Sequence, residues 1–162
     1  MDPIRVGHGF DVHQLTEGLP FILGGVTIPW HRGAVGHSDA DVLIHAICDA
    51  LLGAAALHDI GYHFPDTDPQ YKGINSALLL QRVVNLLTEN HWRIGNIDTT
   101  IALQEPKISP YMAQMQQKLS RIMSLPVSAV SIKATTTEHL GFTGRGEGIA
   151  AWAVALLYST KE

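Results

Sequence analysis

Residues 39–57 constrain the fold more than any other segment, because their pattern predicts a helix without a polar face. Alanine and leucine dominate the later part of this segment, and apolar residues fall almost all the way round it. Such a helix must be largely buried, so the rest of the chain has to surround it. Ser38 is expected to cap the helix, with Asp41 three residues later in a capping-box arrangement.

Alternating apolar residues indicate the strands that could cover this helix. In residues 4–13 the alternation places Asp11 and His13 on the same face of one strand. Gly7 and Gly9 lie on that face too and leave it bare, which we interpret as room for a ligand to approach closely.

Further periodic segments complete the predicted architecture. Strands are expected over residues 92–103, 127–134 and 149–158, helices over 75–90 and 109–123, and two short strands around a turn within 21–28. This order predicts an α+β fold of the α/β two-layer kind, with one mixed four-stranded main sheet covered by helices on one face and a small extra hairpin. Residues 1–162 are expected to form a single domain.

Composition narrows the range of functions. The chain is 46% hydrophobic and 16% charged, against roughly 25% charged for an average soluble domain, which favours a surface partly covered by copies of the chain. Its formal net charge is −4 and it has no basic run, so we expect no nucleic-acid partner. The single cysteine, Cys48, excludes an intrachain disulfide and a cysteine-based zinc cage. No apolar signal core and no apolar run of roughly 18 residues is present, so we expect a cytoplasmic protein without a membrane partner.

Asp11 and His13 are metal-ligand types that point the same way from one strand. His45 is the best candidate for a third ligand, because it lies in the long helix among apolar neighbours, where an unpaired imidazole would be costly. Two histidines and one carboxylate with an open fourth position are typical of a catalytic zinc site. The spacing alone also fits a hydrogen-bonded core histidine beside a solvated Asp-x-His pair.

Other polar segments could contact a charged substrate. His37 and Ser38 precede the helix, where N–H groups and the helix dipole favour phosphate, although a plain cap fits the same residues. The carboxylates of residues 59–68 suit sugar hydroxyls or Mg²⁺, or form turns beside proline and glycine. Residues 135–138 combine three threonines with a glutamate, which suits phosphate and a cation but also a flexible loop. Lys107 is either a phosphate contact or an ordinary surface lysine.

Five long segments stand out when the chain is taken as a whole: GHGFDVH, GHSDADVLIHAICDALLGAAALHDIG, FPDTDPQYKG, LQEPK and KATTTEHLGFTGRGEGIA. Together and in this order they resemble the family of 2-C-methyl-D-erythritol 2,4-cyclodiphosphate synthases of the non-mevalonate isoprenoid pathway. The resemblance covers residues 4–157, nearly the whole chain. His58 departs from it, since a small residue such as glycine is expected there.

The resemblance implies a phosphorus–oxygen lyase. Such an enzyme converts 4-diphosphocytidyl-2-C-methyl-D-erythritol 2-phosphate into 2-C-methyl-D-erythritol 2,4-cyclodiphosphate and CMP, by metal-assisted attack of the 2-phosphate on the β-phosphate. One anion attacks another, so positioning and charge stabilisation matter more than proton transfer. The family implies a homotrimer with active sites between subunits and a central cavity that can hold an isoprenoid diphosphate.

The same resemblance implies roles for individual residues. The expected metal ligands are Asp11, His13 and His45 for Zn²⁺, and Glu138 for a second divalent cation, Mg²⁺ or Mn²⁺. The expected catalytic residues are His37 and Thr136. The small-molecule cytidine-diphosphate substrate is expected to contact Asp11, His13, Ser38, Asp59, Ile60, Gly61, Phe64, Pro65, Asp66, Thr67, Asp68, Leu103, Pro106, Lys107, Ile108, Ser109, Thr135, Thr137, Glu138, Phe142 and Arg145. Phe142, Arg145 and Glu147 match residues that line the central cavity.

Two alternative functions remain open. A metal-dependent phosphohydrolase would use the open zinc position to activate water and would release orthophosphate. A non-enzymatic trimeric binder of isoprenoid diphosphates would need the cavity residues but not Asp11, His13 and His45.

Overall fold

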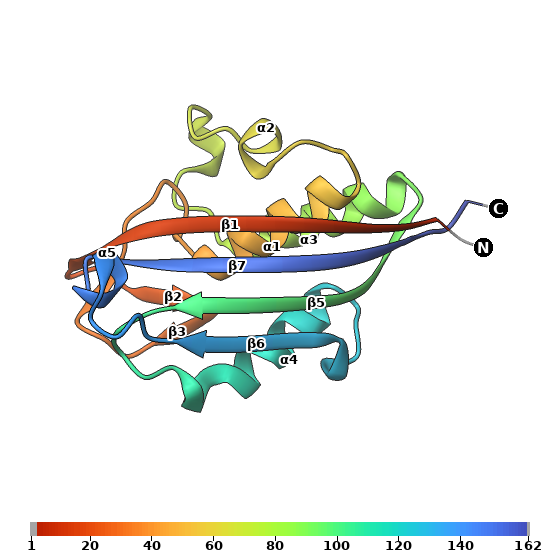
Figure 1. Ribbon diagram of the computed structural model, residues 1–162. Coiled ribbons are helices and arrows are strands. Elements are labelled where there is room, and N and C mark those ends of the chain that lie inside the picture. The colour runs from red at the N-terminus through yellow and green to blue at the C-terminus, as the bar shows by residue number, and fades with distance from the viewer. Residues whose placement is uncertain (1–2, 162) are drawn as a thin grey trace.

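A sheet of five strands forms one layer of the molecule (Figure 1). The computed structural model describes residues 3–161, so the ends expected for the domain, residues 1 and 162, lie outside the described part. The strands occur in the order β4 (Arg32–Ala34), β1 (Ile4–Glu17), β7 (Gly148–Ser159), β5 (Trp92–Ala102) and β6 (Val130–Thr135). Only the β5–β6 pair is parallel, and the other neighbours are antiparallel, so the predicted mixed sheet is confirmed.

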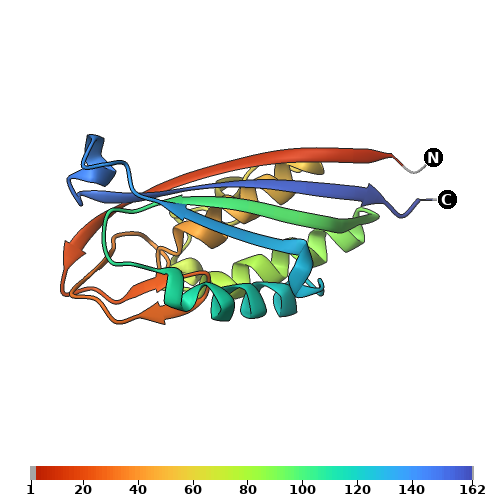
Figure 2. The ribbon, with the colours of Figure 1, turned by 60° about the horizontal axis from the view of Figure 1, so that its bottom comes forward.

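Helices cover one face of this sheet, as predicted. They are α1 (Val42–Ala54), α3 (Ser76–Glu89) and α4 (Met112–Ile122), and Figure 2 shows them together on one side of the strands. The predicted hairpin is formed by β2 (Phe21–Leu23) and β3 (Val26–Ile28). The short elements are α2 (Ile60–His63), α5 (Gly141–Gly144) and the 3-10 turns Pro69–Tyr71, Ser109–Tyr111 and Val127–Ala129. In residues 3–161, no helix combines the length and the apolar character that crossing a membrane requires.

The prediction of four main strands is wrong by one edge strand. β4 has only three residues, Gly33 at its centre, and it pairs with Leu15–Glu17 at the far end of β1. Three residues are too short for an alternating pattern to show. The pairing depends on β1 continuing past His13, where the sequence no longer alternates.

The predicted cap of the long helix is also wrong. α1 begins at Val42, and Asp41 is its N-cap, with Oδ1 accepting a hydrogen bond from the Ile44 N–H at 3.1 Å. Ala40 has a φ of 56°, a left-handed conformation from which a right-handed helix cannot continue. Ser38 therefore lies outside the helix, and its hydroxyl accepts from the Ala40 N–H at 3.2 Å.

Gly7 and Gly9 do allow a close approach, but α1 makes it rather than a ligand. A Cβ atom at Gly9 would lie 1.9 Å from the carbonyl oxygen of Ala46, and one at Gly7 would lie 1.9 Å from that of Ala50. The bare face of β1 therefore lets the helix backbone press against the strand. This contact brings the first turn of α1 next to the side chains that follow Gly9 along β1.

The opposite face of the sheet exposes apolar side chains along β1 and β7, and no described helix covers it. Phe10 of β1 contacts Trp152 of β7 with ring centroids 5.3 Å apart, whereas β5 and β6 expose the ion pair of Asp98 and Lys133. Val6 is the most exposed of the set, at 66%. The members are Ile4, Val6, Phe10, Val12, Trp152 and Val154. We call this set the open sheet face.

Candidate active site

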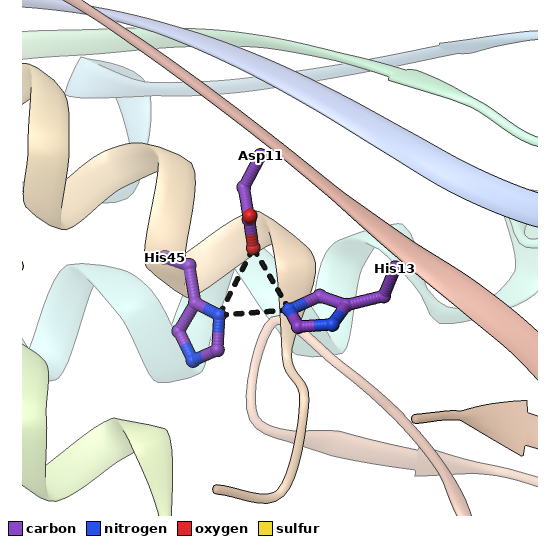
Figure 3. A group of neighbouring side chains, drawn as sticks. All are labelled: Asp11, His13 and His45. Atoms are coloured by element: carbon purple, nitrogen blue, oxygen red, sulfur yellow. Dashed lines mark hydrogen bonds and ion pairs between the residues drawn. The ribbon is translucent and has the colours of Figure 1, made fainter. Parts of the chain in front are cut away.

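Asp11, His13 and His45 converge on one point, as the sequence predicted (Figure 3). Asp11 and His13 extend from the helix-facing side of β1, and His45 extends from the first turn of α1. The Asp11 Oδ2 atom lies 2.9 Å from His13 Nε2 and 3.0 Å from His45 Nδ1. The two imidazole nitrogens are 3.1 Å apart. The three atoms therefore form a small triangle that a single cation can contact.

The hydrogen bonds around this triangle leave acceptor atoms pointing inward. His13 donates its Nδ1–H to the Val35 carbonyl oxygen at 2.7 Å, so in the neutral ring Nε2 carries a lone pair. The Nε2 atom of His45 lies 2.9 Å from the Ser76 hydroxyl on the side away from the triangle. Two imidazole nitrogens and a carboxylate oxygen facing one another repel unless a cation lies among them. This donor set fits a divalent metal with nitrogen and oxygen ligands.

In the metal-free protein the contacts within the triangle shift the pKa values of Asp11 and His13. Burial alone would raise the pKa of the Asp11 carboxyl, but hydrogen bonds and charge attraction from His13 and His45 outweigh it and lower the pKa to about 2. Burial alone would lower the pKa of His13, but its contact with Asp11 raises it above the ordinary 6.5. Both shifts show that the site attracts positive charge.

A pocket of about 390 Å³ opens beside the triangle, and we call it the metal-side pocket. Its predicted lining residues are His13, His37, Ser38, His45, Ile60, Gly61, Phe64, Pro65 and Asp66. It also contains three residues that the sequence did not single out, Tyr71, Ile74 and Leu79. Of these three residues, only Leu79 lay in a recognisable sequence pattern, a helical spacing of apolar residues. That spacing is equally typical of a core residue, so it did not indicate a pocket.

The remaining aspartates of the predicted loop have structural contacts. Asp59 is the N-cap of α2 and accepts from the Tyr62 N–H at 2.8 Å. Asp68 accepts from the Gln70 N–H at 3.0 Å at the following 3-10 turn. Neither of them, nor Thr67, lines the metal-side pocket. The contacts of Asp59 and Asp68 in this structure are therefore those of turn-forming residues.

His37 and Ser38 line the metal-side pocket without the helix N-terminus that was expected to support them. The helix starts at Val42, and the Ile44 N–H of its first turn donates to the buried Asp41 carboxylate. The prediction that a helix N-terminus lies directly beside His37 and Ser38 is therefore wrong, and their contact with phosphate stays a prediction. What the two residues offer instead is the His37 side chain and the Ser38 hydroxyl at the pocket wall.

A second pocket of about 470 Å³ lies where the parallel strands β5 and β6 end, and we call it the strand-end pocket. Its predicted lining residues are Leu103, Pro106, Lys107, Ile108, Ser109, Thr135 and Thr136. Gln104, Glu105, Met112 and Ala134 complete it and were not predicted. Carboxyl ends of parallel strands are a common place for ligands. No residue lines both this pocket and the metal-side pocket.

The polar residues of the segment that follows Thr136 do not line the strand-end pocket. The Thr137 hydroxyl donates to the Leu140 carbonyl oxygen at 2.7 Å and contacts the Thr143 hydroxyl at 2.7 Å, so it closes the turn before α5. Glu138 is exposed, and its Oε1 atom accepts from the Thr136 hydroxyl at 3.3 Å. Arg145 is exposed and paired with Glu147 at 2.8 Å. Phe142 and Glu147 line a third hollow of about 430 Å³ that also reaches His13.

Comparison with known proteins agrees with the arrangement of these residues. The chain is 62% identical over 156 residues to a protein of Syntrophobacter fumaroxidans named 2-C-methyl-D-erythritol 2,4-cyclodiphosphate synthase, with 96% of this chain and 98% of the relative covered. It superposes on a solved IspF of Plasmodium falciparum in complex with CDP with a TM-score of 0.86 at 33% identity, covering 99% of each chain. It also matches the bifunctional IspDF of Campylobacter jejuni with a TM-score of 0.94 at 41% identity, covering 98% of this chain and 43% of that one. The sequence profile of the YgbB family matches residues 4–158, and the chain belongs to that family.

Proposed function

We propose that this chain is a 2-C-methyl-D-erythritol 2,4-cyclodiphosphate synthase, which releases CMP from 4-diphosphocytidyl-2-C-methyl-D-erythritol 2-phosphate. The observation that carries the proposal is the triangle of Asp11, His13 and His45 at the edge of a pocket, in a chain that matches the named synthases over nearly its full length. Each of the three side chains offers an acceptor atom to the same point. A site of this kind suits a substrate whose reacting groups are phosphates.

Asp11, His13 and His45 would hold Zn²⁺, and three protein ligands would leave a coordination position open to a phosphate oxygen. Bound there, the ion would neutralise phosphate charge and fix the orientation of the reacting group. Glu138 would contribute to a second site for Mg²⁺ or Mn²⁺. Because Glu138 is one exposed carboxylate, the diphosphate oxygens of the substrate would have to supply most of the remaining ligands.

In the proposed reaction the 2-phosphate forms a bond to the β-phosphorus while the bond from that phosphorus to CMP breaks, which makes the enzyme a phosphorus–oxygen lyase. His37 and Ser38 are at the pocket wall, where they can hold the attacking phosphate. Thr136 and Lys107 line the strand-end pocket, where they can hold the α-phosphate that leaves as part of CMP. Alignment of the two anions is the main task of these side chains.

The two pockets would take different parts of the substrate. The metal-side pocket, with Phe64 and Asp66, suits the methylerythritol part, and the strand-end pocket suits the cytidine diphosphate. The solved relative in complex with CDP supports a cytidine-diphosphate ligand. Because the pockets share no lining residue, we infer that each active site combines the metal-side pocket of one copy with the strand-end pocket of another.

Three copies meeting at the open sheet face would form the homotrimer that this inference requires. The face exposes aliphatic and aromatic side chains that water solvates poorly, which favours association. Phe142 and Arg145 would then lie where a central cavity can hold an isoprenoid diphosphate. The proposed unit is a single synthase domain over residues 1–162 that works in the cytoplasm.

One assay tests the function directly. The purified protein is incubated with the cytidine-diphosphate substrate, Zn²⁺ and Mg²⁺, and the products are followed by phosphorus NMR. CMP and a cyclic diphosphate are expected. Orthophosphate would instead identify a phosphohydrolase, and unchanged substrate would identify a binder without this activity. His45→Ala should lower turnover by about 10²–10⁴, which corresponds to roughly 3–5 kcal/mol of activation free energy.

A further inference from the structure

His45 has a chain of hydrogen bonds behind it that the proposed reaction does not use. Its Nε2 atom lies 2.9 Å from the Ser76 hydroxyl, and that hydroxyl donates to Oδ1 of Asp39. The second oxygen of Asp39 accepts from the Ser76 N–H at 3.0 Å. Ser76 is the first residue of α3 and is 0% exposed. One carboxylate therefore holds both the side chain and the backbone of a fully buried serine.

This chain favours the neutral form of His45 with the proton on Nε2, and it opposes Asp11, whose Oδ2 atom lies 3.0 Å from Nδ1 and favours the other form. An ionised carboxylate only accepts hydrogen bonds, so the one hydroxyl hydrogen of Ser76 must point to Asp39. The Ser76 oxygen can then only accept from His45, so the contact with Ser76 favours the form with the imidazole proton on Nε2. The lone pair of the neutral ring is left on Nδ1, the atom that faces Asp11 and His13.

The other contact of the His45 Nε2 atom cannot make this selection. The Ser38 hydroxyl lies 3.1 Å from Nε2, and its oxygen already accepts from the Ala40 N–H. Its hydrogen remains free to turn toward Nε2 or away from it. Without the Asp39–Ser76 pair, Asp11 alone would select the form, and its carboxylate accepts from a proton on Nδ1.

The same segments also fix the wall of the metal-side pocket. The Gly73 N–H donates to the His37 carbonyl oxygen at 2.7 Å, and the Asp39 N–H donates to the Ile74 carbonyl oxygen at 3.1 Å. Residues 37–39 and 73–76 thus form a clasp in which Asp39 contributes both backbone and side chain. His37 and Ile74 of this clasp line the pocket. The pocket wall and the imidazole of His45 are held by one local structure.

We propose that Asp39, acting through the Ser76 hydroxyl, is a positioning residue that keeps His45 in the orientation and proton form with Nδ1 open to the metal. Outer partners of this kind typically change metal affinity by about 10–100-fold when they are removed. The role rests on the proposed metal site. The form of the ring, however, is measurable in the metal-free protein.

The test compares full-length Ser76→Ala and Asp39→Ala with the parent protein after removal of metal by a chelator. Nitrogen-15 NMR of the imidazoles, at a pH where the rings are neutral, reports which nitrogen carries the proton. The parent is expected to have a larger share of His45 with Nε2–H than either variant. Ser76→Ala leaves Asp11 as the acceptor that selects the ring form, so it should shift His45 toward Nδ1–H. Asp39→Ala frees the Ser76 hydrogen to turn toward Nε2, so it should shift His45 toward Nδ1–H.

Zinc affinity, measured by competition with a coloured chelator, is the second readout. Both variants should bind about 10–100-fold more weakly. The matched control is Ser120→Ala, which removes a serine that is 4% exposed and donates to the Gln117 carbonyl oxygen within α4. It should leave the ring form and the affinity unchanged. If Ser76→Ala does not fold, Ser76→Cys replaces it, because the thiol keeps the shape of the side chain and is a weak donor and acceptor.

An unchanged proton form of His45 in all variants would overturn the proposal, even if activity falls. An effect of Ser120→Ala equal to that of Ser76→Ala would overturn it too, since the effect would then reflect general loosening. Failure of the parent to make CMP would count against the proposed function alone. The ring form would in that case still decide the role of Asp39.

Discussion

At the scale of single residues, Gly9 determines how closely α1 can approach β1. We predict that Gly9→Ala destabilises the fold by about 3 kcal/mol, because the added Cβ would lie 1.9 Å from the Ala46 carbonyl oxygen and 2.7 Å from the Ala50 N. Displacing the helix would also separate His45 from Asp11, so zinc affinity should fall. Urea unfolding and chelator competition measure the two effects.

Gly53→Ala, in α1, is the control for this substitution. A Cβ at Gly53 meets nothing within 4 Å, and alanine is the better helix former, so this variant should gain about 0.5–1 kcal/mol. A Gly9→Ala protein as stable as the parent would show that the helix can move away without loss.

Asp11 links the site to stability at low pH. Its pKa of about 2 in the folded metal-free protein lies below the ordinary 3.8, so the shift adds about 2 kcal/mol of stability above pH 5. This contribution is lost as the pH falls through 4 toward 2. The contribution of His13, whose pKa is raised, is complete below its ordinary 6.5 and so does not change in that range.

The stability difference between the metal-free parent and Asp11→Asn should therefore be about 1 kcal/mol smaller at pH 3 than at pH 5. Urea unfolding curves at the two pH values measure it. Equal differences at both values would mean that the Asp11 carboxyl has an ordinary pKa in the folded chain.

The metal ligands could be predicted because they lie in segments with strand or helix periodicity. The residues that hold His45 from behind, Ser76 and Asp39, could not be predicted in this way. Alternation placed Asp11 and His13 on one face of a strand, and helical spacing placed His45 among buried residues. Ser76 gave no such signal, because a serine in the first turn of a helix is normally part of a cap. Its contact with Asp39, 37 residues away, exists only in the tertiary structure.

At the scale of elements, Asp41 joins the β2–β3 hairpin to the start of α1. Its side chain is fully buried and accepts from the Gly24 N–H at 2.9 Å and the Gly25 N–H at 2.6 Å, besides the Ile44 N–H. Burial raises the pKa of this carboxyl, and the three donors oppose that rise. The hairpin thus fixes the helix one turn before His45.

We predict that Asp41→Ala lowers the free energy of unfolding by about 3–5 kcal/mol, because it removes a cap and leaves buried N–H groups without acceptors. Asn75→Ala removes an exposed cap of α3 that accepts one hydrogen bond, from Ala77, and should cost about 1 kcal/mol. Chemical unfolding of both variants gives the comparison. Similar losses for the two would show that the hairpin contact contributes little.

The long elements were predictable because each is periodic over several turns or pleats, whereas β4 and the start of α1 depend on single contacts. Val42 starts the helix because Ala40 is left-handed and Asp41 is satisfied by the hairpin, and neither fact is visible in a local pattern. β4 forms because the end of β1 offers it a partner.

At the scale of the whole molecule, the chain separates its two pockets and leaves one sheet face uncovered. One face of β1 and β7 packs against α1, and the other face exposes the apolar side chains of the open sheet face to solvent. The metal ligands come from β1 and α1, while Thr136 follows β6 at the strand-end pocket. A ring of copies would cover the open sheet face and could bring the metal-side pocket of one copy to the strand-end pocket of the next.

Mixing two inactive variants tests this shared site. His45→Ala lacks a metal ligand and Thr136→Ala lacks a strand-end contact, so each should be inactive alone. In a cyclic trimer every mixed ring contains one interface at which both halves are intact. Random mixing in equal amounts makes about three-quarters of the rings mixed, so about a quarter of all sites should recover.

Subunit exchange is verified by mass spectrometry of intact rings, and activity is measured as CMP release from the same samples. Sites built within one chain would never recover, because every chain carries a damaged residue. Mixed rings with no more activity than the separate variants would therefore rule out the shared site. Recovery of about a quarter of the sites would require His45 and Thr136 of different copies to act on one substrate.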